Sequence, residues 1–205
     1  MIFLSQIYLD PFNPSVRQAM KNHQDMHRNI MKAFQGPRKN SEVLYRLVEK
    51  KDSYEIIVLS KERPKWEFIQ SNGYICLNIT DYSNILERFH DGVVLRFNLR
   101  AAATKKVKRN GAKNSSRVCL KTVEERAGWL ERQAYNNGFE LLEMNEVRSD
   151  ILFSVRKTDD SFQFRATEFA GVLKIVDHEL FSRSWPNGFG PEKAYGMGLM
   201  LLSRV

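Results

Sequence analysis

Apolar and polar positions along this 205-residue chain switch repeatedly between alternation and a spacing of three to four residues. Alternation is typical of half-buried strands, and the wider spacing is typical of helices that pack on one face. The pattern therefore predicts a mixture of short strands and helices. The predicted strands are 2–9, 43–49, 54–60, 93–101, 139–145, 151–157, 162–176 and 197–203. The predicted helices are 15–20, 23–34, 82–90, 122–136 and 177–185.

Two of these helices carry start signals. Thr122 with Glu125 three residues later forms a capping box, and Asn137-Gly138 provides a stop. Asn22 followed by Asp25 is similar to a capping box and predicts a helix that starts near His23. The elements form two β-α-β-β sets, one from Ile2 and one from near Val93. This order fits two ferredoxin-like units, although periodicity alone supports only an α+β chain of one or two domains.

The distribution of charge limits the classes of molecule that the chain is expected to bind. The formal net charge is +8, and 42% of the residues are hydrophobic, which is enough for a core. No Asp or Glu occurs between Gly92 and Val123. A cluster of cations without acids favours a polyanion, although such runs are often only solvated. Nucleic acid is favoured over a membrane surface, and we expect no membrane partner, because the run is not on an amphipathic helix with an apolar face. The cations of this window are Arg96, Arg100, Lys105, Lys106, Lys108, Arg109, Lys113, Arg117 and Lys121.

Other classes are disfavoured. The two cysteines, Cys76 and Cys119, form no CxxC pair, so neither a zinc ribbon nor a redox pair is indicated. His23 and His27 lie one helical turn apart and could share a metal, but no third ligand is evident and we expect no metal site. The N-terminus lacks a signal peptide, and no apolar stretch is long enough to span a membrane. We therefore expect an intracellular, cytoplasmic protein with no cofactor.

The final eighteen residues are unusually rich in glycine. Gly188, Gly190, Gly196 and Gly198 surround Lys193 just before a short apolar run. The spacing excludes a dinucleotide fingerprint, because Lys193 stands where the sixth-position glycine would be, and a P-loop, because no Gly-Lys-Ser/Thr occurs. Two interpretations remain: a loop whose N–H groups bind phosphate, or a tight turn between two elements.

The closing string from Gly188 to Leu199 resembles the final motif of the repeat-associated RNA-binding superfamily. Its CRISPR type I-E branch, the CasE endoribonucleases of the Cascade complex, is the most similar. Residues 95–103 resemble a basic strand of that family, with Ala103 in place of the family's proline. The segment from Lys121 to Leu130 also resembles the family, and so does Met26-His27-Arg28 followed by Lys32.

The resemblance implies a fold of two tandem ferredoxin-like (βαββαβ) domains, residues 1–90 and 91–205. It implies an endoribonuclease that cleaves CRISPR precursor RNA at repeat stem-loops without metal and keeps the product. Other Cascade subunits would be its protein partners. His27 would transfer protons, Lys32 would stabilise charge and Arg28 would contact phosphate. The implied RNA-binding residues are the nine cations above with Gly188, Gly190, Lys193, Gly196 and Gly198.

One departure leaves an alternative open. The family's tyrosine falls on Gln24, which can hydrogen bond but cannot act as a phenolic acid or base. A non-catalytic RNA-binding subunit of the same fold is therefore the second interpretation. A basic, ribosome-type nucleic-acid-binding protein is the third.

Overall fold

The computed structural model describes residues 1–34, 42–51, 53–108, 115–155 and 161–205. The N-terminal half contains one four-stranded antiparallel sheet in the order β2-β3-β1-β4. Its elements, in chain order, are β1 (Phe3–Leu9), α1 (Pro14–Lys21), α2 (His23–Met31), β2 (Leu44–Glu49), β3 (Tyr54–Ser60), the 3₁₀ helix η1 (Trp66–Asn72) and β4 (Tyr74–Asp81). A second 3₁₀ helix, η2 (Ser83–Arg88), leads into the C-terminal half.

The C-terminal half contains a second four-stranded antiparallel sheet, in the order β10-β5-β9-β8. A small two-stranded hairpin, β6–β7, follows its first strand. The elements are β5 (Val94–Ala101), β6 (Thr104–Val107), β7 (Ser116–Cys119), α4 (Val123–Asn136), β8 (Phe139–Val155), β9 (Ser161–Ile175), α5 (His178–Ser184), η3 (Trp185–Asn187), η4 (Lys193–Tyr195) and β10 (Met200–Arg204).

Both sheets have the same topology. Numbered within each half, the strands run fourth, first, third, second across the sheet, which is the ferredoxin-like order. The predicted α+β class with two tandem ferredoxin-like units is confirmed. The predicted boundary near residue 90 falls between the two sheets, which draw on residues 3–81 and 94–204.

The sequence was misleading at β8, where two strands were predicted and one 17-residue strand is found. The ladder between β8 and β9 shifts register between Leu141 and Glu143 and again between Glu146 and Arg148. Each irregularity displaces the alternation by one position, so apolar and polar residues no longer follow a period of two. No strand was predicted between residues 101 and 122, but this part of the basic stretch contains the β6–β7 hairpin.

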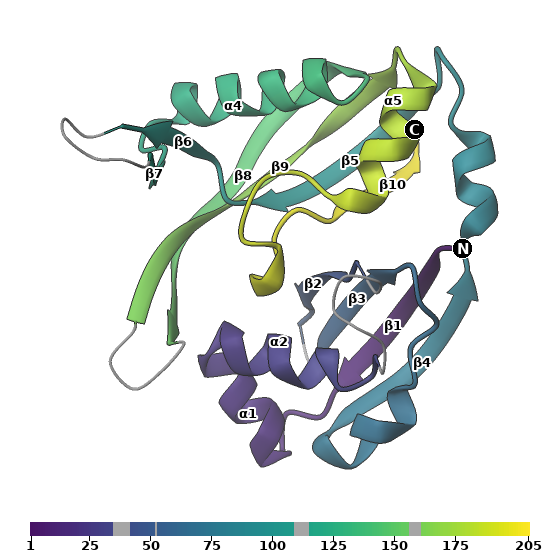
Figure 1. Ribbon diagram of the computed structural model, residues 1–205, viewed down its shortest axis with the longest axis vertical. Helices are drawn as coiled ribbons and strands as arrows, with labels where there is room; N and C mark the ends of the chain where they lie inside the picture. The colour runs from purple at the N-terminus through teal and green to yellow at the C-terminus, as the bar shows by residue number, and fades with distance from the viewer. Residues whose placement is uncertain (35–41, 52, 109–114, 156–160) are drawn as a thin grey trace.

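Figure 1 shows how the two halves meet. Helices α1 and α2 cover one side of the first sheet, and the long β8–β9 hairpin bends away from the second sheet toward α2. The hairpin is held there by Asn22, whose side-chain amide donates to the Val155 carbonyl at 3.2 Å and whose oxygen caps Gln24 N–H at 3.1 Å. The N-terminus of α2 is therefore fixed by the opposite half of the chain.

Candidate active site

Helix α2 presents His23 and His27 on one face, because residues four apart lie almost above one another on a helix. His23 packs edge-on against the Phe164 ring of β9, with ring centroids 6.1 Å apart. Burial lowers the pKa of His23, and the neighbouring Arg100 guanidinium lowers it further. His27 is half-buried one turn later. The face that carries both histidines therefore lies at the boundary between the two halves.

The glycine-rich loop meets α2 at this boundary. The Tyr195 hydroxyl donates to the Gln24 side-chain oxygen at 3.1 Å, and the Tyr45 hydroxyl of β2 donates to the Ala194 carbonyl at 2.9 Å. These bonds connect the loop to both a helix and a strand of the N-terminal half. They hold the helix turn of Gln24, directly before His27, against the loop.

The other two predicted catalytic residues, Arg28 and Lys32, are each bonded to a neighbouring side chain of the same segment. Arg28 is exposed and forms an ion pair with Asp25 at 2.8 Å. The Lys32 ammonium donates to the Asn29 side-chain oxygen at 3.1 Å. Lys32 follows His27 by five residues, about 140° around an ideal helix, so the two side chains diverge on that spacing. The catalytic roles of His27, Arg28 and Lys32 stay predictions.

All four glycines of the loop have φ between +71° and +90°, where a side chain is strained. A Cβ on Gly190 would lie 2.8 Å from the Trp129 ring, and one on Gly188 would lie 2.8 Å from Leu44. Gly196 and Gly198 are buried. These observations support the tight-turn interpretation for the backbone shape, and phosphate binding by the glycines stays a prediction.

Lys193 is partly buried in the same loop. Its ammonium donates to the Asn187 carbonyl at 2.6 Å. Burial lowers the pKa of Lys193, while the Glu42 carboxylate acts in the opposite direction. This bond holds the ammonium against its own loop and leaves two of its three N–H donors for another acceptor.

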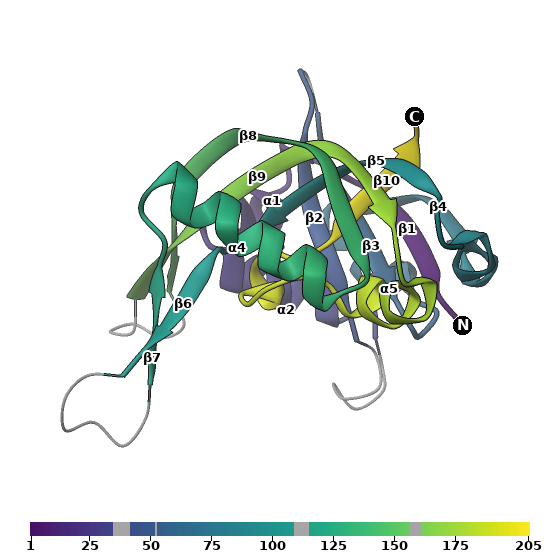
Figure 2. The same ribbon diagram turned by 90° about the horizontal axis from the view of Figure 1, so that it is seen from above.

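The predicted cations separate into two groups. Lys105, Lys106, Lys108, Arg117 and Lys121 are exposed on or beside the β6–β7 hairpin, which projects from the body in Figure 2. Arg109 and Lys113 lie outside the described residues. Arg96 is exposed on β5, whereas Arg100 is only 8% exposed. Arg100 lies 3.8 Å from the Asp150 carboxylate, at the boundary beside His23.

A buried ion pair also joins the two halves, and no sequence pattern indicated it. Arg46 of β2 donates to the Glu168 carboxylate of β9 at 2.8 Å and to the Asn98 carbonyl at 3.1 Å. Burial opposes ionisation of Glu168, but the hydrogen bond from Asn98 and the charge of Arg46 outweigh it and lower the pKa. Tyr195 was missed as well, although it lies inside the closing motif.

The described ranges offer neither a metal cluster nor a membrane span. In these five ranges, no three His, Cys, Asp or Glu side chains are grouped so that they could hold a metal ion. None of the helices described there is both long and apolar enough to cross a bilayer. Cys76 and Cys119 are both free thiols.

Two tandem ferredoxin-like units with a histidine-bearing helix, a glycine-rich loop and a basic hairpin define a protein of the repeat-associated RNA-binding class. The chain belongs to the CRISPR associated protein family, whose model matches residues 2–204. The type I-E resemblance found from the sequence is thereby confirmed.

Individual relatives agree over almost the whole chain. The CRISPR-associated endoribonuclease Cse3 of Thermus thermophilus is 29% identical, over 97% of this chain and 98% of the relative. The structure of Thermus thermophilus Cse3 bound to an RNA representing a pre-cleavage complex is 28% identical, with a TM-score of 0.85 and 98% of each chain covered. A structure of Cse3 bound to a 19-nucleotide RNA is also 28% identical, with a TM-score of 0.83, covering 99% of this chain and 100% of that one.

Proposed function

We propose that this protein is an endoribonuclease that cleaves CRISPR precursor RNA within repeat stem-loops without a metal ion. The observation that carries the proposal is its similarity, over 98% of both chains, to Cse3 bound to a pre-cleavage RNA. The site geometry supports it, because the histidine face of α2 lies against the glycine-rich loop at the boundary between the halves.

The proposed reaction uses the substrate's own 2′-hydroxyl as nucleophile. The hydroxyl loses its proton, its oxygen bonds to the adjacent phosphorus, and the bond from phosphorus to the 5′-oxygen breaks. The leaving oxygen gains a proton, which gives a 2′,3′-cyclic phosphate and a 5′-hydroxyl end. No metal is required because the nucleophile is already held beside the phosphorus. A histidine can transfer a proton near neutral pH, so His27 takes one of the two proton transfers.

Charge on the phosphate must also be stabilised. The exposed Arg28 guanidinium can do so by exchanging its bond to Asp25 for a phosphate oxygen. Lys32 is bonded to Asn29 and lies about 140° around an ideal helix from His27, so we assign it the smaller share of the charge stabilisation. Gln24 can orient a group by hydrogen bonding but cannot supply the second proton transfer.

The RNA would be held mainly by backbone contacts. A-form stems are recognised by shape and phosphate position, which suits an exposed basic hairpin. Lys105, Lys106 and Arg117 of β6–β7 are the main candidates, with Arg96 and the glycine-rich loop nearer the cut. We further propose that the protein retains its product, works with other Cascade subunits, and acts in the cytoplasm, where its two free thiols stay reduced.

The test is cleavage of the cognate repeat RNA in excess EDTA by the wild-type protein and by His27→Ala. The exposed His90 provides the matched control, His90→Ala. We expect cleavage in EDTA by wild type and His90→Ala, and loss of at least about 100-fold in rate for His27→Ala, the lower range for a general acid or base. An RNA with 2′-deoxyribose before the cut should bind without being cleaved. Loss of cleavage in EDTA would overturn the metal-free mechanism.

A non-catalytic RNA-binding subunit remains the second candidate. Two observations favour it: Gln24 stands where the family has tyrosine, and the Lys32 ammonium is bonded to the Asn29 side chain. Tight binding of the repeat RNA with no product under any of these conditions would select this function.

A further inference from the structure

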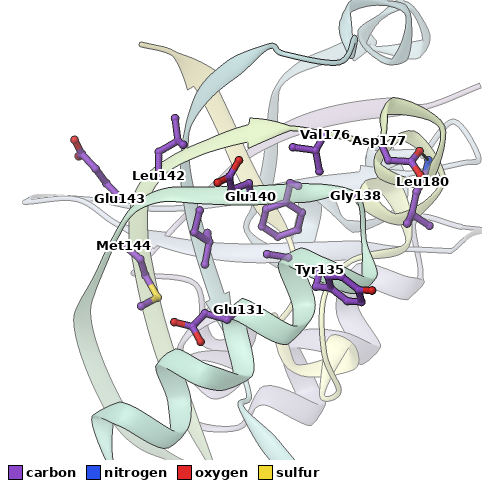
Figure 3. Close-up of a pocket in the computed structure, with 13 residues that line it drawn as sticks. Glu131, Tyr135, Gly138, Glu140, Leu142, Glu143, Met144, Val176, Asp177 and Leu180 are labelled. Carbon is purple, nitrogen blue, oxygen red and sulfur yellow. Dashed lines mark hydrogen bonds between the residues drawn. The ribbon is translucent and has the colours of Figure 1, made fainter.

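A groove of about 770 Å³ lies at the C-terminal end of α4, between that helix, the start of β8 and the beginning of α5 (Figure 3). Its apolar lining is partly open to solvent. Tyr135 is 88% exposed, and Leu142 and Val176 are each 49% exposed. In Figure 3, Leu142 and Val176 lie on one side of β8 and Tyr135, on α4, lies on the other, so exposed apolar side chains flank this strand. Such an exposed apolar surface indicates that a partner covers it.

The charge of this groove is opposite to that of the chain as a whole. Its charged lining residues are all acidic: Glu131, Glu140, Glu143 and Asp177. The negative end of the α4 dipole, at Asn136, lies beside them. Phosphate would be repelled here, although the chain carries a net charge of +8. The groove therefore suits a cationic partner and not RNA.

The groove also borders an open sheet edge. Strand β8 is the last strand of the order β10-β5-β9-β8, and residues 139–141, 143 and 144 pair with β9 on one side only within the described residues. The backbone N–H and C=O groups on the other side of an edge strand are available to an added strand. Apolar contacts, acidic neighbours and an open edge together specify the shape of the occupant.

We propose that this groove binds an extended protein segment, with alternating apolar and Lys or Arg residues, as an added strand beside β8. The segment belongs to a protein subunit of the ribonucleoprotein, so the inference rests on the proposed function in that assembly. The basic hairpin lies at the opposite end of α4, about 20 Å away for a 14-residue helix. RNA and the protein segment can therefore bind at the same time.

The first test is photocrosslinking in the assembly purified with its guide RNA. A benzophenone amino acid replaces Leu142, and the same substitution at Phe12, which is 87% exposed in the N-terminal half, is the matched control. We expect position 142 to crosslink to a subunit peptide that contains apolar and basic residues, and position 12 not to crosslink to that peptide. Crosslinks from 142 to RNA, to a second copy of this chain, or to nothing would overturn the proposal.

The second test reverses the charge of the groove. Glu140→Lys with Glu143→Lys should lower incorporation into the assembly at least tenfold. The control pair, Glu67→Lys with Glu87→Lys, makes the same charge change at two exposed sites of the N-terminal half and should leave incorporation unchanged. Equal incorporation of both pairs would overturn the proposal.

Cleavage of repeat RNA by the isolated wild-type and variant proteins distinguishes a failure of the proposed endoribonuclease function from a failure of the proposed binding groove. The Glu140/Glu143 variant should cleave at the wild-type rate, which also shows that it folds. If the wild-type protein cleaves no RNA, the proposed function is wrong. The crosslinking and incorporation results still test whether the groove binds a protein segment.

Discussion

The Tyr195 hydroxyl, in the loop that precedes the last strand, donates to the Gln24 side-chain oxygen on α2 at 3.1 Å. The two residues are 171 positions apart. Their bond links the closing loop with the helix turn that precedes His27. The glycine-rich motif therefore positions α2, whether or not it also contacts RNA.

Tyr195→Phe tests this positioning. Loss of the hydrogen bond should lower the free energy of unfolding by about 1 kcal/mol. If the bond aligns His27, kcat for repeat cleavage should fall about tenfold, which corresponds to about 1.4 kcal/mol in the transition state, while KM changes little. Urea unfolding and single-turnover kinetics measure the two effects. Tyr135→Phe, at an exposed tyrosine, is the control and should change neither.

Titration of His23 should make stability depend on pH. Its folded-state pKa is lowered by burial and by Arg100, so the unfolded chain binds the proton first as pH falls. The stabilisation is therefore full above the unfolded pKa near 6.5 and is lost as pH falls below it. Urea unfolding at a pH about one unit above and one unit below this value should show a larger loss for the wild type than for His23→Gln. His90→Gln, at an exposed histidine, should keep the wild-type loss.

Gly190→Ala should destabilise the protein more than Gly92→Ala. Both glycines have positive φ, +81° and +88°, so both substitutions incur a backbone cost of roughly 1–2 kcal/mol. Only at Gly190 would the new Cβ also meet a ring, that of Trp129 at 2.8 Å, whereas nothing lies within 4 Å at Gly92. Overpacking adds about 1–3 kcal/mol. Equal losses in thermal or urea unfolding would contradict the packing role of the loop.

Removal of the Arg46 side chain should lower the free energy of unfolding. Arg46 is only 6% exposed and forms an ion pair with Glu168. Arg46→Ala therefore leaves a partly buried carboxylate without this cation. The expected loss in unfolding free energy is about 3 kcal/mol. In Arg46→Ala/Glu168→Gln the loss should be smaller than the sum of the two single losses. Additive losses would show that the pair is not coupled.

The β6–β7 hairpin should determine how RNA binding depends on salt. Removal of one cation that binds a phosphate lowers the slope of log affinity against log salt concentration by about 0.7 to 0.9. Arg117→Ala and Lys106→Ala should each show this change in binding titrations between low and moderate salt. Arg17→Ala, at an exposed arginine on α1, is the matched control and should keep the wild-type slope. If the salt dependence of binding is unchanged in the hairpin variants, the RNA stem does not bind at the hairpin.

Features of the fold that depend on residues close together in the sequence were predicted correctly. The capping box at Thr122 is present, with Glu125 N–H donating to the Thr122 hydroxyl at 3.2 Å, because both partners lie within one helical turn. Strand β3 occurs at the predicted residues, since its apolar run is bounded by polar turns. The 3₁₀ helix η1 was not predicted, whereas the 3₁₀ helix η2 lies within the predicted helix 82–90.

The site was only partly readable from the sequence. His27 and the glycine loop were found because a family motif carries them, but the hydrogen bond that joins Tyr195 to Gln24 was not. Arg46 and Glu168 lie 122 positions apart, and each looks like an ordinary strand residue. Pairs of this kind depend on how the two sheets face each other, which neither periodicity nor composition encodes.

The hydrogen bonds of Asn22 to the end of β8 connect the two halves, as do the Arg46–Glu168 ion pair and the Tyr195–Gln24 bond. One hydrophobic cluster also contains Leu44 and Leu59 of the first sheet together with Leu99 and Phe169 of the second. A protease cut between residues 82 and 93 would therefore leave two fragments that remain associated. Such a nicked protein would still elute as one particle in size-exclusion chromatography and separate only in denaturant.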